Sequence, residues 1–347
     1  MYINRYVINT AQHIYPINDN EVAIISSLGN SCIKGPGMAA AMMDILSCFT
    51  EPMCLDMAIS TLSKKYNIDN LEKLLNRCID KRLLVSETEA KASSKHSKEF
   101  LDNAFFYTSG GKTLDEVIDT LSSVKIGIIG KNKLVSNLLR ILAECGVQSE
   151  VHTGITDSIA EIEIPNSELS IHSCKISFDL DGISNVINKC DYIVATDSYD
   201  NHFFFNGINT LCLQKNKRWI RIVTNGLNAE IGPFVDPGET CCYACLISRR
   251  RRHLTDGELV FYNMFSDEQL HKKAVANPII FSILAPLVKM VAGVACSELL
   301  KFIMGMKCSL INNVISLNCL DYSTQKERVF RNYQCPVCSM EERGMYV

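Results

Sequence analysis

Two pairs of cysteines, each separated by two residues, carry the clearest chemical signal in the sequence. Cys242 and Cys245 lie in GETCCYACL, and Cys335 and Cys338 lie in QCPVC. This spacing lets both thiolates of a pair point at one metal ion, and two pairs complete the four sulfur ligands of a structural zinc site. Cys241 adjoins the first pair and competes for its place, but the spacing favours Cys242. We therefore expect a Zn²⁺ site that fastens the C-terminal tail to the domain before it.

The cysteine content as a whole indicates a reducing compartment. The sequence holds 16 cysteines, and its opening MYINRY segment is polar rather than a secretory signal. We therefore expect a cytoplasmic protein whose grouped cysteines bind metal rather than form disulfides. Redox thiols and chance pairs are the alternatives to a metal site.

Charge and hydrophobicity argue against two kinds of partner. The net charge of −3 over 347 residues argues against nucleic acid. The apolar stretch at 274–305 contains Pro286, Lys289 and Glu298, and charged groups are costly inside a bilayer. We expect two buried helices there and no membrane span.

The elements that position the cysteines predict a large α/β domain. The stretch VKIGIIGKNKLVS at 124–136 indicates a buried strand that runs into Gly130 and then a helix, the usual place of a phosphate-binding loop. Further on, CDYIVATDS predicts a second buried strand that ends at Asp197, and HFFFNGINTLCLQKN and RWIRIVTN follow as a helix and a strand. This alternation is typical of a mainly parallel, Rossmann-like sheet covered by helices, and we assign it to 99–347.

The first 88 residues indicate a separate small domain. Three strand patterns, RYVINTAQHIYPI, EVAIISSL and NSCIKG, precede three helical patterns. The third helix, NLEKLLNRCIDKRLL, places Leu71, Leu75 and Cys78 on one face. This order resembles a winged-helix domain at 1–88, with a polar linker at 89–98. Because the third helix carries no excess of basic residues, peptide recognition is favoured over DNA binding.

Taken together, these segments resemble the ThiF/MoeB superfamily of ubiquitin-activating-like adenylating enzymes. The resemblance rests on the strand with a phosphate-loop position, VATDS, GPFVDPGETCCYACL, ANPIIFSILAPLVKMVAGVACSELLKFIMG and the terminal CPVC. It covers about 99–340. The small domain in front is similar to the precursor-recognition element of peptide natural-product clusters. The whole chain is similar both to ThiF-like partner subunits of azole-forming cyclodehydratases and to adenylating enzymes of the microcin type.

The phosphate loop departs from the pattern of active relatives. They carry a GxGGxG loop, because only glycine lets the backbone approach ATP phosphates closely. Here Gly130 is the one glycine retained, and other residues fill the remaining positions, namely Asn132, Lys133 and Val135. No carboxylate ends the next strand, EVHTG, where active members hold the ribose. The basic segment that stabilises the transferring phosphate has no counterpart in 155–185.

One residue of the nucleotide site is retained. Asp197 matches the position that binds magnesium in active relatives, so we interpret Gly130 and Asp197 as a vestigial nucleotide site. Asp197 also fits a second interpretation, as the N-cap of the following helix. Lys131 and Lys133 could bind phosphate as point charges, but we expect them to be solvated.

The resemblance implies a role in maturing a ribosomally made peptide. The chain would bind the leader of the precursor, present it to a YcaO-type cyclodehydratase that forms thiazoline or oxazoline rings, and activate that partner. A flavin dehydrogenase is a further partner in such systems, and the superfamily usually forms homodimers. On this interpretation the chain is not catalytic on its own. The alternative is an enzyme that adenylates a peptide C-terminus with ATP–Mg²⁺. A third interpretation, a sulfur-carrier-activating protein, is disfavoured by the extra N-terminal domain.

A leader peptide would add as a strand beside NSCIKG and lie against the third helix of the small domain. The residues expected to contact the peptide are Ser31, Cys32, Ile33, Lys34, Leu71, Leu75, Arg77 and Cys78. The alternative is that this sheet edge packs against the second domain.

The remaining candidates have structural explanations. The run Arg249–Arg252 would either grip an acidic peptide or partner, or form a solvated loop. His202 has no nucleophile spaced beside it, and Cys212 lies among apolar residues. We expect neither to be catalytic.

Overall fold

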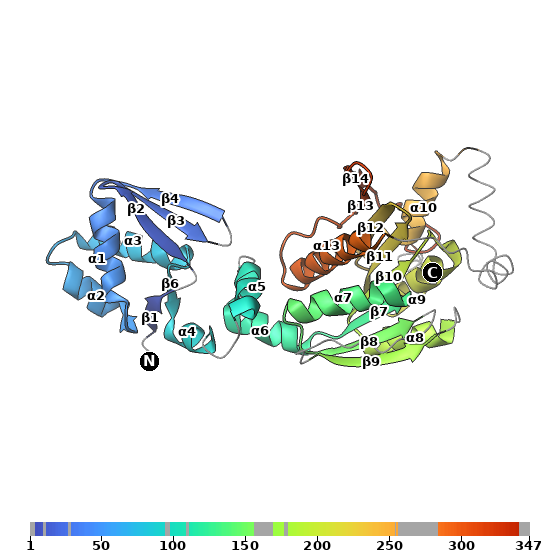
Figure 1. Cartoon of the computed structure of the whole chain (residues 1–347), viewed down its shortest axis with the longest axis horizontal. Coiled ribbons are helices and arrows are strands. Elements are labelled where there is room, and N and C mark those ends of the chain that lie inside the picture. Colours follow the sequence, from blue (N-terminus) through green and yellow to red (C-terminus); the bar gives the residue numbers. More distant parts are fainter. Residues whose placement is uncertain are drawn as a thin grey trace, which may run out of the picture. The chain divides into compact units, whose positions relative to one another are not determined.

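The chain folds into two compact units, 1–119 and 120–347 (Figure 1). The computed structural model describes residues 4–9, 12–26, 29–93, 98–108, 111–155, 169–176, 180–253, 255 and 284–339. The two units are described separately below.

The first unit combines two small antiparallel sheets with helices. One sheet has the order β5-β1-β6 and the other β2-β3-β4. The strands are β1 (Arg5–Ile8), β2 (His13–Asn18), β3 (Glu21–Ser26), β4 (Gly29–Lys34), β5 (Met53–Cys54) and β6 (Leu84–Ser86). The helices are α1 (Met38–Cys48), α2 (Leu55–Leu62), α3 (Ile68–Asp80), α4 (Glu87–Ser93) and α5 (Lys98–Thr108), and α6 (Leu114–Ser123) runs across the boundary at 119/120.

The strand pattern RYVINTAQHIYPI divides between the two sheets instead of forming one strand. The chain leaves the first sheet at Asn9, whose backbone N–H bonds to the Leu83 carbonyl at 2.9 Å and whose side-chain amide bonds to the Arg82 carbonyl at 2.9 Å. These bonds hold Asn9 against the end of α3 and separate β1 from β2. The prediction of three strands was therefore too low, and it also missed β5 and β6, which are only 2 and 3 residues long.

Helix α3 has the predicted cap and face. The Asn67 side chain accepts a hydrogen bond from the Asn70 N–H. Its apolar stripe packs into a core shared by α1, β3 and β4, with Met42, Ile24 and Ile33 among the buried members. Burial of this stripe fixes α3 against α2 and α1, where the Cys78 sulfur lies 3.7 Å from that of Met42.

The polar segment after the first unit's core begins as a helix rather than as an extended linker. In α4 the Ser86 hydroxyl accepts a hydrogen bond from the Glu89 N–H at 3.2 Å, and Glu89 also pairs with Arg82. Ser86 and Glu89 have the Ser-x-x-Glu spacing of a capping box, which starts helices even in sequences without bulky side chains.

The second unit is built on an eight-stranded sheet with the order β14-β13-β12-β11-β10-β7-β8-β9. Neighbours from β11 to β9 are parallel, and neighbours from β11 to β14 are antiparallel. The strands are β7 (Ile126–Gly130), β8 (Glu150–Ile155), β9 (Ser170–Lys175), β10 (Tyr192–Asp197), β11 (Arg218–Asn225), β12 (Asn228–Val235), β13 (Asn313–Asn318) and β14 (Thr324–Arg328). This is the mainly parallel α/β domain that the sequence predicts.

Helices cover both faces of this sheet (Figure 1). The helices are α7 (Asn132–Glu144), α8 (Leu180–Lys189), α9 (His202–Gln214), α10 (Tyr243–Arg251) and α13 (Ala285–Ile303). Helices α7 and α13 pack together on one face, and α8, α9 and α10 follow one another on the other. Aromatic side chains of α9 stack on the sheet, as where Phe205 lies 6.5 Å from Trp219 of β11.

The long apolar stretch near the C-terminus contains one buried helix in the part described. Helix α13 buries Leu287, Val291 and Leu299 among other side chains. The remainder of the predicted helix pair, before residue 284, lies outside the described residues. Within the described ranges, no helix has both the length and the apolar character needed to cross a bilayer.

Candidate functional site

The two cysteine pairs meet at the start of α10. Cys242 is the N-cap of that helix, Cys245 lies in its first turn, and Cys335 and Cys338 lie in the turn that follows β14. The Sγ of Cys242 lies 3.7 Å from that of Cys335, and the Sγ of Cys245 lies 3.6 Å from that of Cys338. All four sulfur atoms lie within 4.8 Å of one another, and all four residues are buried.

This geometry fits a tetrahedral metal ion. Sulfur ligands at about 2.3 Å from a metal lie about 3.8 Å apart at tetrahedral angles, which matches the 3.8 Å between the Sγ atoms of Cys242 and Cys245. Contacts among the four thiols lower the pKa of Cys245 and Cys335 and raise that of Cys242. The Asn332 N–H points at the Cys245 sulfur from 3.4 Å, as do amides that stabilise metal-bound thiolates. The cluster can therefore hold a metal ion.

Cys241 does not belong to this cluster. Its N–H donates to the Asn312 side chain at 2.8 Å, and it lies outside the group of four converging sulfurs. Of the adjacent pair Cys241 and Cys242, the cysteine that joins the cluster is Cys242, which is the one that the CxxC spacing favours.

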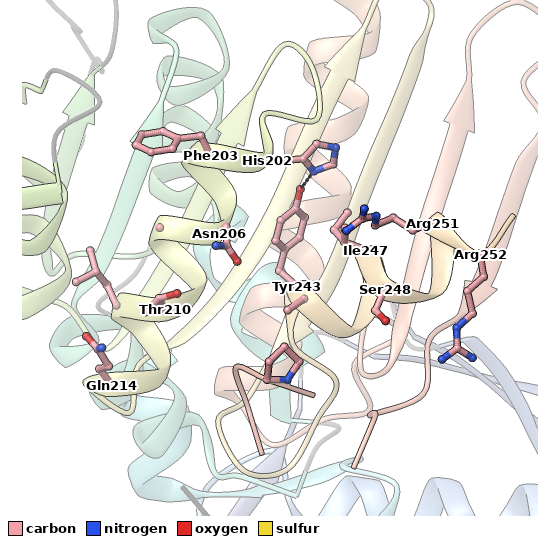
Figure 2. A pocket seen from close by; sticks show the side chains of 14 residues that line it. His202, Phe203, Asn206, Thr210, Gln214, Tyr243, Ile247, Ser248, Arg251 and Arg252 are labelled. Carbon is pink, nitrogen blue, oxygen red and sulfur yellow. Dashed lines mark hydrogen bonds between the residues drawn. The ribbon is translucent and has the colours of Figure 1, made fainter. Parts of the chain in front are cut away.

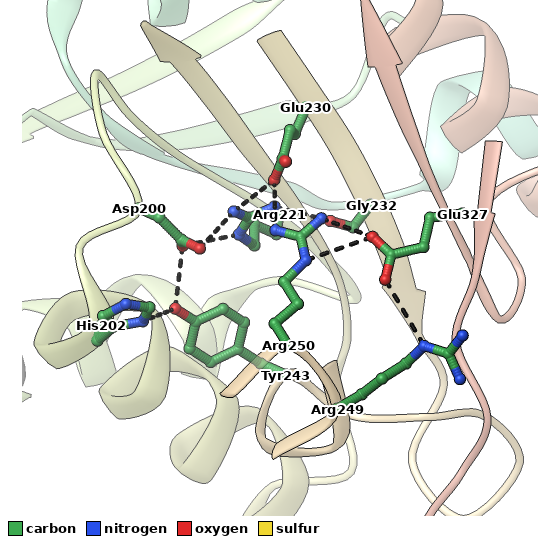
Figure 3. A network of polar contacts seen from close by, with 9 residues as sticks. All are labelled: Asp200, His202, Arg221, Glu230, Gly232, Tyr243, Arg249, Arg250 and Glu327. Carbon is green, nitrogen blue, oxygen red and sulfur yellow. Dashed lines mark hydrogen bonds and ion pairs between the residues drawn. The ribbon is translucent and has the colours of Figure 1, made fainter. Parts of the chain in front are cut away.

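A buried arginine anchors α10 to the sheet (Figure 3). Arg221 lies in β11 with 0% of its side chain exposed, and it pairs with Asp200 at 2.8 Å and Glu230 at 2.9 Å. The Tyr243 hydroxyl of α10 donates to Asp200 at 3.0 Å, and the Nδ1 atom of His202 lies 2.6 Å from the same hydroxyl. The cysteine cluster and this network thus contact the same helix from two directions.

The network continues to the edge of the sheet. Arg250 of α10 pairs with Glu230 at 2.9 Å and with Glu327 of β14 at 2.9 Å, and Arg249 also reaches Glu327. Burial opposes ionisation of Glu230, but the charges of Arg221 and Arg250 outweigh it and lower its pKa to about 2. The sequence carries one signal of this network, an arginine in the middle of the apolar strand RWIRIVTN, which must be paired if it is buried. The network was not predicted from that signal.

Gly130 is required by packing whether or not a nucleotide binds. Its φ is +154°, and a Cβ at this position would lie 2.2 Å from the Thr196 carbonyl oxygen of β10. Any side chain would therefore push β7 and β10 apart. The conformation explains why this glycine is present in a loop that has no other.

Lys131 lies beside Asp197, the residue that the sequence marks as part of a vestigial nucleotide site. Its Nζ donates to the Ser198 hydroxyl at 2.8 Å and lies 3.6 Å from Oδ1 of Asp197. Only 34% of its side chain is exposed. The expectation that Lys131 is solvated is therefore wrong, because β7 and β10 are neighbours and bring it against Asp197.

Asp197 is held by its own loop and is not a helix cap. The carboxylate accepts hydrogen bonds from the Ser198 N–H at 2.6 Å and the Asn201 side chain at 3.0 Å. Asn201, not Asp197, caps α9 by accepting from the Phe204 N–H at 3.1 Å. Burial raises the pKa of Asp197 and the nearby Lys131 opposes this rise. The oxygens of Asp197 thus face protein donors and the ammonium group of Lys131.

The expected peptide site lies at the edge of a sheet in the first unit. β4 pairs with β3 on one side, and the sheet order leaves its other side without a strand among the described residues. Cys32 and Lys34 are exposed there, both contacting Glu21, at 3.0 Å and 2.7 Å. Ser31 is partly exposed, and Arg77 of α3 is exposed.

Other residues expected in the peptide groove are core residues. Those fully covered by their own unit are Ile33, Leu71, Leu75 and Cys78. The apolar stripe of α3 and the inward side of β4 face the same core, so these side chains are not available to contact a peptide in this structure.

A cavity of about 850 Å³ opens between α9 and α10 (Figure 2). Two residues of the arginine run, Arg251 and Arg252, line it, whereas Arg249 and Arg250 are paired with glutamates. His202 contributes to the rim, and Cys212 lies in the core beneath, as the sequence indicated. Pro336 and Ala244, which belong to the two cysteine turns, also line the cavity.

Fold and cysteine cluster together define a ThiF-type protein. Residues 155–337 match the ThiF family, and the chain belongs to that family. A comparison with curated proteins finds no match.

Solved structures of two other proteins share the fold across both units. Escherichia coli MccB crystallised with succinimide superposes with a TM-score of 0.73 at 16% sequence identity, covering 97% of this chain and 99% of MccB. The microcin C7 biosynthetic enzyme MccB in complex with N-formylated MccA gives a TM-score of 0.72 at 17% identity, covering 96% and 99%. The heterocyclase TruD gives a TM-score of 0.64 at 16% identity, covering 98% of this chain but 44% of TruD.

Proposed function

We propose that this protein binds the leader of a ribosomally made precursor peptide and presents the peptide to a separate modifying enzyme. The observation that carries this proposal is the contact of Lys131 with Asp197 and Ser198, at 3.6 Å and 2.8 Å. An ammonium group stands where a nucleotide-using relative needs a metal ion, and the loop before it lacks the glycines that would admit phosphates. The chemistry is therefore assigned to a partner.

The partner is proposed to be a YcaO-type cyclodehydratase that forms thiazoline or oxazoline rings. The likeness to TruD supports this choice, because TruD is a heterocyclase of which the present chain spans only 44%. The part of TruD outside the match would correspond here to a second protein. A flavin dehydrogenase and homodimer formation remain part of the same proposal.

The leader is proposed to add as a fourth strand beside β4. In antiparallel ladders, residues whose backbone groups face the partner alternate with residues whose groups face away. Gly35 donates to the Asn20 carbonyl at 2.9 Å, and the register pairs Lys34 with Glu21 and Cys32 with Ala23. The backbone N–H groups of Cys32 and Lys34 consequently face the open edge, where an extended peptide can pair with them.

Zinc is the metal proposed for the cysteine cluster. Four buried thiolates leave no position open for water or substrate, which is the arrangement of structural zinc sites. Its role here is to join the C-terminal turn to α10.

A second candidate function is adenylation of a peptide C-terminus with ATP–Mg²⁺. Two observations favour it: the match with MccB extends over 99% of that enzyme, and Asp197 is present at the end of β10. Under this alternative Lys131 would have to leave Asp197 before a metal ion could bind.

Leader binding is tested on the full-length protein with the precursor encoded in the same gene cluster. Cys32→Pro removes a backbone donor on the open edge without breaking the pairing with β3, and proline is tolerated in edge strands. We expect this variant to weaken binding of the leader about tenfold, as for loss of one or two backbone hydrogen bonds. Cys32→Ala keeps the N–H group and should bind like the wild type. If the proline variant and the wild type bind the leader with equal affinity, the edge of β4 is excluded as the leader-binding site.

A further inference from the structure

The cavity between α9 and α10 has the dimensions of a ligand site. Its volume of about 850 Å³ falls within the usual range for such sites, about 300–1,000 Å³. Its walls belong to the second unit alone and lie on the α9 and α10 side of the sheet.

One wall carries a regular ladder of polar side chains. Asn206, Thr210 and Gln214 are spaced by four residues along α9 and point into the cavity (Figure 2). Asn206 and Gln214 are exposed and Thr210 is partly exposed, and none of the three has a hydrogen-bond partner among the described residues, so all three are accessible to a ligand. Beside the ladder runs an apolar stripe, also spaced by four, that consists of Phe203, Gly207 and Leu211.

The spacing of this ladder suits an extended peptide. Four residues of an α-helix rise about 6 Å, and two residues of a strand rise about 6.6 Å. Successive polar side chains of the ladder therefore have nearly the same spacing as the backbone groups along one side of an extended peptide. Amide and hydroxyl side chains can both donate to and accept from peptide groups. Glycine at position 207, unusual inside a helix, leaves room for a backbone to approach α9.

The charge on the other wall selects the kind of peptide. Arg251 and Arg252 line the cavity near the C-terminal end of α10, whereas Arg249 and Arg250 are paired with Glu327. No acidic side chain of the described ranges forms an ion pair with Arg252. A carboxylate on the ligand would complement this end of the cavity.

The walls are fixed before any ligand arrives. Cys242 and Cys245 hold the start of α10 at the metal cluster, and Tyr243 is bonded to Asp200 at 3.0 Å. A preformed groove loses little entropy on binding, which favours short ligands.

We propose that the groove between α9 and α10 binds an extended peptide segment in which apolar side chains are followed by a carboxylate side chain. The proposed function supplies the source of that segment, the precursor peptide, and the groove is distinct from the leader site on β4. Binding here would hold a second part of the peptide on the second unit.

The test is calorimetric titration of the full-length protein with the acetylated, amidated hexapeptide Leu-Gly-Leu-Ser-Glu-Asp. The matched control peptide carries Gln-Asn in place of Glu-Asp. We expect the acidic peptide to bind, with its affinity falling as salt is raised. Arg252→Gln should weaken it about fivefold. Gly207→Leu, which fills the groove and suits a helix, should abolish it.

Two controls separate this site from its neighbours. Arg249→Gln removes the same charge from the same helix outside the groove and should leave the affinity unchanged. Cys32→Pro should also leave it unchanged, so that the groove can be judged even if leader binding at β4 is disproved. Equal affinity for both peptides, or no effect of Arg252→Gln and Gly207→Leu, would overturn the proposal. So would a change of sedimentation mass in these variants, because the groove would then be a subunit interface.

Discussion

Lys131 is the residue on which the interpretation of the second unit depends most. A carboxylate with 2% of its side chain exposed, such as Asp197, needs a compensating positive charge. In a nucleotide-using enzyme that charge comes from a metal ion. Here the residue directly after Gly130 supplies a positive charge, which offsets part of the cost of burying Asp197.

Replacing Lys131 by alanine should destabilise the protein at neutral pH. The substitution leaves Asp197 buried without its cation, and we expect the free energy of unfolding to fall by about 1–3 kcal/mol. Burial already raises the pKa of Asp197 and Lys131 opposes this rise, so the variant raises the pKa further. A raised pKa means that the folded state binds the proton more readily, and stability then falls as pH rises. The loss should therefore be larger at pH 7 than at pH 5 in urea unfolding.

Lys133 provides the control for this prediction. Lys133 lies in the first turn of α7, the helix whose N-cap residue is Lys131, and its side chain is exposed. Lys133→Ala should therefore change the free energy of unfolding by less than about 0.5 kcal/mol. The same loss in the Lys131 variant at both pH values would contradict the proposed pairing with Asp197.

Single residues could be predicted from the sequence where their chemistry is local. The two CxxC pairs predicted the cluster of four cysteines, because each pair needs only one turn of chain to converge. The contact of Lys131 with Asp197 could not be predicted, since 66 positions separate them and their meeting depends on β7 and β10 being neighbours. Asn201 as the cap of α9 was missed because Asp197 offered an equally good capping side chain.

Helix α10 is the element that joins the cysteine cluster to the sheet. Its first turn carries two of the clustered cysteines, and its last turn carries Arg250, which pairs with Glu230 and Glu327. Arg221 beneath it is fully buried, and its charge is compensated by two carboxylates, Asp200 and Glu230.

Glu230→Gln should destabilise the protein by up to about 3 kcal/mol at pH 7. Arg221 and Arg250 lose a shared partner, but Asp200 and Glu327 still pair with them. The pKa of Glu230 is lowered to about 2 from an ordinary value of 4.5. A lowered pKa stabilises the fold above the ordinary value, and this contribution is lost as pH falls from about 5 towards 2. The difference between wild type and variant should accordingly shrink on acidification, measured by chemical unfolding at several pH values.

Glu327→Gln is the matched change at the outer end of the network. Because 34% of the Glu327 side chain is exposed, its loss should cost less than about 1 kcal/mol. Equal effects of the two glutamine variants would show that burial of Arg221 does not govern the stability of this region.

Elements with a buried face were predictable, and elements at the rim were not. The strands β7, β10 and β11 and the helices α7 and α9 follow from their apolar patterns. Edge strands β9 and β14 were missed because their side chains are mostly exposed and polar, which removes the alternation that marks a strand. The helix α4 was missed because its stability comes from a capping box rather than from apolar residues.

The second unit is closed by a cluster that joins residues 242–245 to residues 335–338. The long stretch 246–334 lies between these two segments. A metal ion bound by both segments would therefore restrict that stretch in the unfolded chain. Because the site is absent from the unfolded state, metal binding adds directly to folding free energy.

Replacing both Cys335 and Cys338 by serine should release the metal ion and lower the melting temperature by about 10 °C or more. Elemental analysis of the purified protein should find close to one zinc per wild-type chain and none in the variant. Cys319→Ser, at a cysteine outside the cluster, should retain both metal and stability. Unchanged metal content in the double variant would remove the cluster assignment.

The central claim, that this protein binds a peptide and leaves the chemistry to a partner, is tested most directly by nucleotide use. Full-length protein is titrated with ATP–Mg²⁺ and assayed for pyrophosphate exchange, each with and without the precursor peptide. The contact between Lys131 and Asp197 predicts no binding at millimolar nucleotide and no exchange under either condition. Millimolar or tighter affinity, together with peptide-dependent exchange, would contradict the account and establish an adenylating enzyme.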